Sequence, residues 1–390
     1  MGQTVASDSS FLLGPKQWHI EQRTAKGTPV VDMWKIPIPK DSSAYPALNA
    51  EHHLVWSPAT AQEGGYNHYA CLIRYNDKLF AMWSNHPYGE DAPGQRVMYA
   101  VSEQWGVWSQ PKELFAPPGP VKDRNSDGIH LKADRWAIVD NVLYAIVYVH
   151  GAGKYPIARS LQINGESGEP FLLDVLPSGA TLPTYMSNTS ASPISKKLKD
   201  WYRSNDKVSW WADKDQGINR TAVDGSSLIE SFMYRAKDNT LVLMLRNWGT
   251  PSNPVHNNRV YVSFSNNYNQ WDRAYPTNIP DAPTRGDALR LADGTILLIG
   301  THYAPRLDKA LYLDRDPLTV AVSRDGYRFD KVYSIRTGAP KTWHIPNVGG
   351  RNPGFAYTSS VVDNGYLYTL YSVGKEDLAI SRVPLEEILK

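Results

Sequence analysis

Two histidines flank the first clear hairpin pattern in the sequence. His68 stands just before the apolar run CLIRY, and His86 ends the polar tail of the run KLFAMWS, with the turn Asn76-Asp77 between the two runs. The open ends of an antiparallel hairpin lie at one edge of the sheet, so the two side chains are expected near each other. Imidazole is the side chain best suited to proton transfer near neutral pH. The two histidines are therefore the candidate catalytic residues.

Other candidates follow from the repetition of this hairpin. An apolar strand, a turn of Asn, Asp or Gly, and a second apolar strand recur at Leu72–Ser84, Ala137–Val149, Phe232–Arg246, Ala288–Gly300 and Ser360–Val373. Further strands end in Ser and are followed by an aromatic residue six positions later, in VMYAVSEQWGVW, VYVSFSNNYNQW and VAVSRDGYRF. Four short antiparallel strands repeated about every 50 residues indicate a β-propeller.

The chain length predicts the number of blades. Dividing 390 residues by about 55 per blade gives about seven blades, with six as the alternative. The widest interval between hairpins has room for a further unit, near Ile157–Leu173 or Val208–Ala212. The predicted fold class is therefore all-β, a seven-bladed β-propeller of four-stranded antiparallel blades.

The whole chain, residues 1–390, is predicted to form this single propeller domain. Residues 1–50 contain several prolines and are interpreted as an irregular lead-in that helps close the ring. One helical turn is expected at Pro384–Leu389, whereas the stretch SKKLKD at 195–200 is expected to be a solvated loop.

The propeller places the ends of certain strands on one face. The loop that enters the innermost strand of a blade and the loop that leaves its second strand open around the same mouth. These loops supply His68, Arg135, Arg220 or Glu230, Arg285 and Tyr357 at the entering positions, and His86, His150, Arg246, His302 and Lys375 at the leaving positions. Histidines and arginines are therefore predicted to converge on this mouth, while the opposite turns carry ordinary polar residues.

Each candidate also has an ordinary structural interpretation. A histidine at the end of a strand is commonly a hydrogen-bonded surface residue, and Arg246 could pair with an acid or lay its stem over apolar surface. Glu90 and Asp91 are adjacent, so they would point apart on an extended chain, which favours a structural turn over an acid pair. Cys71 is the single cysteine and lies in a predicted strand, where a buried, inert thiol is expected.

Composition limits the partners that the protein can have. Aromatic residues make up 11% of the chain, with 13 Trp and 23 Tyr, which favours strands and sugar-facing surfaces. A formal net charge of +2 gives no reason to expect a nucleic-acid partner. No apolar run is long enough to span a membrane. We therefore expect a monomer that binds neither nucleic acid nor membrane.

Four segments resemble the sialidase-related seven-bladed propellers that degrade uronic-acid polysaccharides, a group that includes the ulvan lyases and the L-rhamnose-α-1,4-D-glucuronate lyases. They are WSNHPYGEDAPGQRVMYAVS, TNIPDAPTRGDALRLADGTILLIGTH, RDPLTVAVSRDGYRFDK and GYLYTLYSVGKEDLAISRVPL, and the likeness covers roughly residues 52–385. True sialidases carry an Arg-Ile-Pro segment and several well-formed Asp boxes. This sequence has neither, which counts against sialic acid as the substrate.

The resemblance implies roles for individual residues. His68 occupies the position of the catalytic histidine in this group, and His86 matches a second histidine found in some members. Arg246 and Arg285 fit carboxylate-binding positions, and Arg135 and Arg220 are assigned to substrate binding by location alone.

The implied reaction is β-elimination at a 4-linked glucuronate. The C5 proton is weakly acidic, so an arginine fork must neutralise the neighbouring carboxylate before a base can remove it. His68 is then the expected base, and His86 the acid or a positioning partner. Arg246 and Arg285 clamp the carboxylate, and Tyr357 stacks on the sugar. The favoured substrate is the rhamnosyl-α-1,4-glucuronate of gum arabic-type arabinogalactan, which would release L-rhamnose.

Three alternatives remain open on the sequence. One is an ulvan lyase, another is an α-L-rhamnosidase-type hydrolase, and the third is a carbohydrate-binding propeller without turnover. Hydrolysis is the weaker enzymatic alternative because glycosidases generally use two carboxylates, and Glu230 is the obvious acid at the mouth. The resemblance also implies a structural Ca²⁺ ion in the channel, without identifying its ligands. Degradation of an external polysaccharide implies a secreted protein whose signal peptide is absent from this sequence.

Overall fold

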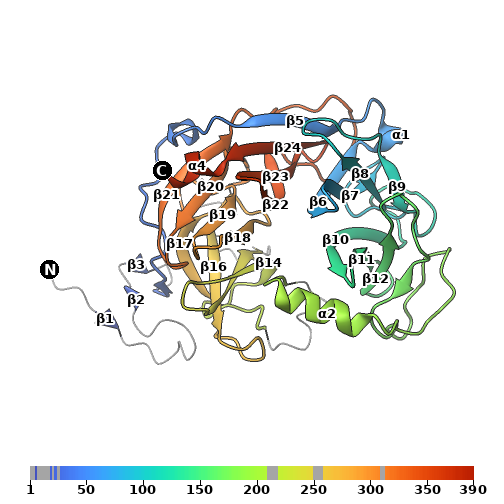
Figure 1. Ribbon diagram of the computed structural model, residues 1–390, viewed down its shortest axis with the longest axis horizontal. Coiled ribbons are helices and arrows are strands. Elements are labelled where there is room, and N and C mark those ends of the chain that lie inside the picture. Colours follow the sequence, from blue (N-terminus) through green and yellow to red (C-terminus); the bar gives the residue numbers. More distant parts are fainter. Residues whose placement is uncertain are drawn as a thin grey trace.

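The computed structural model describes residues 27–208, 218–248, 258–307 and 312–390, together with the short strands β1 (Val5–Ala6), β2 (Trp18–His19) and β3 (Gln22–Arg23). Within these residues, five four-stranded antiparallel sheets surround a centre as the blades of a propeller (Figure 1). In chain order the blades are β6 (Tyr66–Tyr75), β7 (Lys78–His86), β8 (Arg96–Ser102) and β9 (Lys112–Phe115); β10 (His130–Val139), β11 (Val142–His150), β12 (Tyr155–Leu161) and β13 (Phe171–Leu172); β14 (Leu228–Arg235), β15 (Leu241–Asn247), β16 (Arg259–Ser265) and β17 (Tyr275–Pro280); β18 (Asp287–Arg290), β19 (Ile296–Gly300), β20 (Leu318–Ser323) and β21 (Phe329–Arg336); and β22 (Phe355–Asp363), β23 (Tyr366–Val373), β24 (Asp377–Pro384) and β5 (Glu51–Trp56).

The prediction of seven blades is therefore wrong, although the hairpins behind it are confirmed. Each of the five hairpins found in the sequence forms the first two strands of one blade. The number of blades was obtained by dividing the chain length by an average number of residues per blade. This overestimates the count, because long connections between the blades contain many of the residues. Near Ile157–Leu173 the chain completes the second blade instead of starting another. The other location proposed for an additional unit, Val208–Ala212, lies almost wholly outside the described residues.

The expectation of a solvated loop at SKKLKD is also wrong. These residues begin helix α2 (Ser195–Ser204), in which Leu198 and Tyr202 are spaced by four residues and share one buried face. That face packs against the second blade, and the Tyr202 hydroxyl donates a hydrogen bond of 2.8 Å to Asp134. The expected C-terminal helical turn is confirmed as α4 (Leu385–Leu389).

The remaining short elements are a 3₁₀ turn, η1 (Ser42–Ala44), and the single turn α1 (Ala61–Gly64). None of the helices in the described part of the chain is long and apolar enough to cross a membrane.

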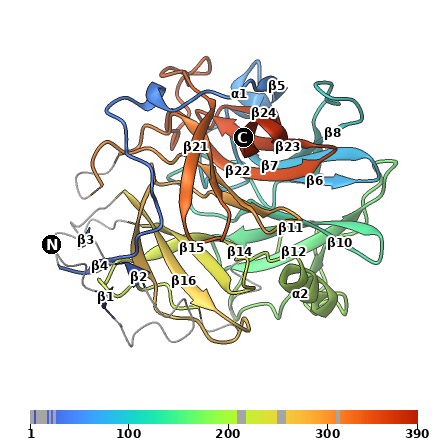
Figure 2. The same cartoon turned by 60° about the vertical axis from the view of Figure 1, so that its left-hand side comes forward.

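The ring is closed by an N-terminal strand. β5 precedes the first blade in the sequence but pairs with β24 as the outermost strand of the last blade, so that His53 lies opposite Ile380 (Figure 1). The described lead-in before it, which includes β4 (Pro29–Val30), runs along the outer strands of the third and fourth blades (Figure 2). Parallel bridges join Val31 to Thr277 and Ala47 to Ser334.

Apolar side chains fill the space between neighbouring blades. Phe232 and Val262 of the third blade share one buried cluster with Leu298 of the fourth. The Ser-to-aromatic pattern after the third strand has a local explanation at Ser323, whose hydroxyl accepts a hydrogen bond of 2.9 Å from the Gly326 amide. Polar side chains thus close the turn, and the aromatic residue that follows it joins the core. Cys71 is a buried free thiol, as expected.

Candidate functional site

A cavity of about 380 Å³ lies at the centre of the propeller. Its walls come from the inner strands β6, β10, β14 and β22, from β11, and from the turn before β18. They are formed by Tyr69, Lys132, Ala133, Asp134, Arg135, Tyr148, His150, Lys154, Val208, Arg220, Ile229, Glu230, Ser231, Arg285 and Tyr357. The structure therefore brings together Arg135, Arg220, Arg285 and Tyr357, which were predicted to bind substrate.

Three of the cavity side chains stand on β-bulges. Tyr69, Glu230 and Tyr357 each lie where the register between an inner strand and its neighbour shifts. Their φ angles are 56°, 50° and 56°, in a region that residues other than glycine rarely adopt. A bulge re-aims a side chain, at a local cost of about 1–3 kcal/mol for the strained backbone. The same device in three different blades aims three reactive side chains at one cavity.

Tyr357 and Glu230 lie in direct contact in the cavity. The Tyr357 hydroxyl donates a hydrogen bond to Glu230 Oε1, and Arg246 Nη1 forms an ion pair with Glu230 Oε2. Burial opposes ionisation of Glu230, but Arg246 and the bond from Tyr357 outweigh it, so the pKa of Glu230 is below its ordinary value. Burial, followed by the Glu230 charge, raises the pKa of Tyr357 well above its ordinary value. The phenol therefore keeps its proton and directs it at a carboxylate base that can accept it.

Arg246, predicted to clamp the substrate carboxylate, is occupied by Glu230 and lies behind the cavity wall. Arg285 does line the cavity, with its guanidinium 5.3 Å from the centre of the Tyr357 ring and one donor bonded to the Ala70 carbonyl. The sequence analysis missed Arg315, which is buried and has Nε and Nη1 without a partner among the described residues. Such cations outnumber the acids here, which suits an anionic ligand.

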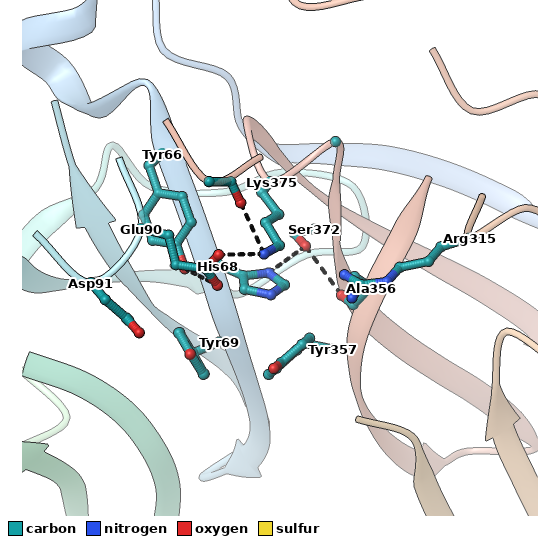
Figure 3. Close-up of polar contacts among 12 residues, drawn as sticks. Tyr66, His68, Tyr69, Glu90, Asp91, Arg315, Ala356, Tyr357, Ser372 and Lys375 are labelled. Carbon is teal, nitrogen blue, oxygen red and sulfur yellow. Dashed lines mark hydrogen bonds and ion pairs between the residues drawn. The ribbon is translucent and has the colours of Figure 1, made fainter. Parts of the chain in front are cut away.

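His68 is fully buried and lies beside the cavity, not on its wall. Its ring is 4.0 Å from the Tyr357 ring, and Nδ1 is 2.8 Å from Ser372 Oγ (Figure 3). Ser372 donates to the Ala356 carbonyl, so Nδ1 carries the proton and Nε2 is left as an acceptor. Burial and the cations Lys375, Arg315, Arg285 and Arg246 lower the pKa of His68 well below its ordinary value. The imidazole is therefore neutral, as a base must be, but Tyr357 separates it from the cavity.

His86 is placed differently from the expectation. Its Nε2 donates to the Pro93 carbonyl at 3.1 Å, and its Nδ1 accepts from the amides of Tyr88 and Gly89 at 3.0 and 3.2 Å. Burial lowers its pKa to about 4. Both ring nitrogens thus hold the loop after β7, and His86 is not on the cavity wall.

The sequence analysis also missed a chain of three polar residues at the cavity edge. Lys132 Nζ donates to the Tyr69 hydroxyl at 3.1 Å and to Asp91 Oδ2 at 2.6 Å. Asp91 has a φ of 58°, and its Oδ1 finds no hydrogen-bond partner in the described part of the chain. Its neighbour Glu90 points elsewhere, toward Lys375 Nζ at 2.7 Å (Figure 3). The two acids do point apart, as expected, but Asp91 is near the site.

The residues present do not fit a Ca²⁺ ion in the channel. Calcium requires six to eight oxygen ligands, whereas the centre is rich in arginine and lysine. Among the described residues, the group that could hold a metal is His344, Glu376 and Asp377, away from the cavity. Glu376 is already bound by Arg351 at 2.6 Å and by His344 at 2.8 Å.

Comparison with known proteins supports this architecture. A family model described as a BNR repeat-like domain matches residues 180–369, just under half of the chain. A solved structure named sialidase matches with a TM-score of 0.66 and 15% identity over 91% of this chain. The chain therefore has a β-propeller fold similar to that of this sialidase. It spans about a third of the length of that sialidase, 35%.

Two other solved structures are similar to this chain. A protein of unknown function from Dyadobacter fermentans has a TM-score of 0.51 and 14% identity, over 86% of this chain and 98% of its own. A Trypanosoma rangeli sialidase mutant with trans-sialidase activity has a TM-score of 0.48 and 11% identity, over 88% of this chain and 60% of its own. No curated protein matches the sequence. At these identities the comparisons establish the fold alone.

Proposed function

We propose that this propeller is a carbohydrate-active enzyme that hydrolyses the glycosidic bond of a carboxylate-bearing sugar, with Tyr357 as the nucleophile. The hydrogen bond from Tyr357 to Glu230 carries the proposal. A hydroxyl is a weak nucleophile unless a neighbouring base takes its proton during attack. The raised pKa of Tyr357 disfavours a free phenolate, so attack and proton transfer to Glu230 occur together. Tyrosine nucleophiles are known among glycosidases.

The reaction proceeds in two displacements at the anomeric carbon. In the first, Tyr357 Oη bonds to this carbon, its proton passes to Glu230, the glycosidic C–O bond breaks, and Asp91 protonates the leaving oxygen. In the second, Asp91 takes a proton from a water molecule, and the oxygen of that water attacks the same carbon. The bond to Tyr357 Oη breaks, and Glu230 returns its proton to this oxygen. Two inversions retain the configuration of the sugar. Asp91 is assigned as the acid because Lys132 fixes Oδ2, while Oδ1 makes no hydrogen bond within the described residues and has His130 Nε2 3.9 Å away.

The substrate carboxylate is bound by the arginines of the cavity. Arg285, Arg135 and Arg220 line the wall and present planar forks that match a carboxylate. The likeness to a fold named sialidase supports a sugar as substrate, and this excess of cations supports an acidic one. An extracellular, monomeric enzyme would suit this substrate and belongs to the same proposal.

A second candidate is β-elimination at a uronate, as the family resemblance implies. It is favoured by Lys132, whose hydrogen bond to Tyr69 would stabilise a phenolate able to remove the C5 proton. In this route Tyr69 is the base, His68 supports Tyr357, and the substrate is rhamnosyl-α-1,4-glucuronate or ulvan. Burial raises the pKa of Tyr69 well above its ordinary value, so the route ranks second.

The two reactions leave different products. Purified protein is incubated with gum arabic, ulvan and aryl glycosides of glucuronic and sialic acids, while reducing ends and ultraviolet absorbance are recorded. Hydrolysis gives reducing ends without absorbance, whereas elimination creates a C4–C5 double bond that absorbs. A fluorinated glycoside should leave a mass-shifted peptide containing Tyr357. Absence of both products and of the labelled peptide would overturn the proposal. An increase in ultraviolet absorbance would instead identify the protein as a lyase.

A further inference from the structure

Two lysines from different blades hold the adjacent acids of the loop after β7. Lys132, in the second blade, binds Asp91 Oδ2 at 2.6 Å, at the edge of the central cavity. Lys375 lies in the turn between β23 and β24 of the last blade and binds Glu90 Oε2 at 2.7 Å (Figure 3). The loop that carries the proposed acid is therefore anchored by the blade on each side of it.

The ion pair between Lys375 and Glu90 is buried. The Lys375 side chain is 5% exposed, and its Nζ also donates to the Gly350 carbonyl at 3.1 Å. The other oxygen of Glu90, Oε1, accepts a hydrogen bond of 3.2 Å from the Tyr66 hydroxyl. Burial lowers the pKa of Lys375 to about 8 and Glu90 opposes this change, so the amine is charged at pH 7. Such a pair fixes both side chains, because either charge is costly to leave unpaired.

Backbone contacts carry this anchor to Asp91. The Glu90 amide donates to the Gly349 carbonyl at 3.1 Å. A Cβ added to Gly350 would lie 2.6 Å from Glu90 Cβ, so the chain at 349–350 packs directly on Glu90. Asp91 follows with a φ of 58°, and its carboxylate points to Lys132 instead of Lys375. A shift of Glu90 would therefore displace the carboxylate of Asp91.

Lys375 itself stands in strained backbone. Its φ is 56°, and its carbonyl accepts a hydrogen bond of 2.8 Å from the Asn67 amide of β6. Strain of this kind persists where the surroundings enforce it, and it is concentrated at functional sites. No step of the proposed reaction uses Lys375, which is not on the cavity wall. The lysine is therefore suited to act through Glu90 and not on the substrate.

We propose that Lys375 is a positioning residue for Asp91, and that it fixes, through Glu90, the loop from which Asp91 reaches the leaving oxygen. This inference rests on the proposed function for the role of Asp91 as the acid. A general acid accelerates the departure of a poor leaving group by about 10²–10⁴-fold. An activated aryl leaving group needs little protonation. Displacement of Asp91 should therefore slow one class of substrate selectively, which a general loss of structure would not do.

The test compares two leaving groups on the same acidic sugar. The ratio kcat/KM, which reports the first displacement, is measured for the nitrophenyl and methyl glycosides of glucuronic acid and of sialic acid. Lys375→Met removes the positive charge and keeps an unbranched side chain, and Glu90→Gln removes the negative charge and keeps the shape. Lys78→Met is the matched control, because Lys78 forms an ion pair of 2.7 Å with Glu103 at the opposite end of β7. Amide hydrogen exchange of residues 88–96 is recorded on the same full-length proteins.

We expect Lys375→Met to lower kcat/KM about 100-fold for the methyl glycoside and less than about threefold for the nitrophenyl glycoside. Glu90→Gln should show the same selectivity, and it decides the result if Lys375→Met does not fold. Residues 88–96 should exchange faster in both variants and at the wild-type rate in Lys78→Met. Equal losses on the two glycosides, or exchange that stays at the wild-type rate, would overturn the inference.

The outcomes also separate this inference from the proposed function. If the wild type cleaves neither glycoside but exchange is faster in Lys375→Met, the proposed hydrolysis fails and the anchoring of the loop by Lys375 stands. If the wild type cleaves both glycosides and neither variant changes their ratio or the exchange, the positioning role fails and the proposed function stands.

Discussion

The Tyr357 hydroxyl, on the inner strand of the last blade, donates a hydrogen bond to Glu230 on the inner strand of the third blade. Both residues lie at β-bulges with left-handed backbone, at φ of 56° and 50°. The sequence separates them by 127 residues. Their contact therefore depends on the closed ring, and any change that opens the ring should separate the two reacting groups.

Removal of the Tyr357 hydroxyl should abolish turnover and leave the fold intact. Tyr357→Phe keeps the ring against His68 and removes the proposed nucleophile, so kcat should fall by at least about 10³-fold. Tyr333→Phe, on β21 and away from the cavity, is the matched control. Product release from the hydrolysed glycoside measures the effect. If the kcat of Tyr357→Phe lies within tenfold of the wild-type value, Tyr357 is not the nucleophile.

His68 is expected to act through Tyr357. His68→Gln keeps an acceptor near Nε2 and should lower kcat by about tenfold, whereas His68→Ala should cost more, because it also leaves a cavity beside Tyr357. Since the ring is already neutral, neither variant should move the acidic limb of the pH–kcat profile. Loss of about 10³-fold in both variants, with a displaced profile, would instead identify His68 as the base.

Arg285 should contribute to the binding of acidic substrates. Arg285→Ala is expected to raise KM about 10–100-fold, since a charge-assisted contact to the carboxylate is lost. Arg285→Lys should not restore binding, because a lysine cannot form the two-pronged contact. Arg324→Ala serves as the control, because Arg324 is exposed and pairs with Asp293 in the turn between β18 and β19, away from the cavity. A KM that is unchanged in Arg285→Ala would remove this residue from the carboxylate site.

Acid should destabilise the fold through its buried histidines. Burial lowers the pKa of His302 to about 3, and of His86, His130 and His150 to between about 2 and 4. Between the unfolded pKa of about 6.5 and the lower pKa of each folded histidine, only the unfolded chain takes up these protons. The free energy of unfolding should therefore fall with decreasing pH, by about 1.4 kcal/mol per pH unit for each such histidine.

Urea unfolding of His302→Gln at pH 6, 5 and 4 tests this linkage. The variant removes one histidine whose ring is buried and bonded to Thr319 at 2.9 Å. Its dependence on pH should be weaker than that of the wild type by about 1.4 kcal/mol per pH unit. Parallel curves for the two proteins would show that His302 is not neutral in the fold.

Substitutions in β5, the strand that closes the ring, should destabilise the fold only where the side chain is buried. Val55 of β5 is buried at 5% exposure in the cluster between the last and first blades, whereas Leu54 is 56% exposed. Val55→Ala should lower the free energy of unfolding by about 2 kcal/mol, from lost burial and the small cavity left behind. Leu54→Ala should change it by less than about 0.5 kcal/mol. Equal effects in urea unfolding would contradict the pairing of β5 in the ring.

Local sequence determined the hairpins of this protein. A turn of Asn, Asp or Gly between two apolar runs specifies a hairpin by itself, and all five such patterns formed the inner half of a blade. The same positions led to Arg135, Arg220, Arg285 and Tyr357, because strand ends share one face of a propeller. In contrast, the number of blades could not be read from chain length, since connections such as the one that contains α2 have no fixed length.

The tertiary structure decided the chemistry of the site. Alternation along a strand fails at a bulge, so the sequence could not show that Tyr69, Glu230 and Tyr357 face one cavity. Nor could it separate His68, which packs behind Tyr357, from His86, whose ring nitrogens are taken up by backbone. Turns and strands follow from interactions between near neighbours in sequence. Partners, burial and pKa depend on contacts between blades, which only the closed ring creates.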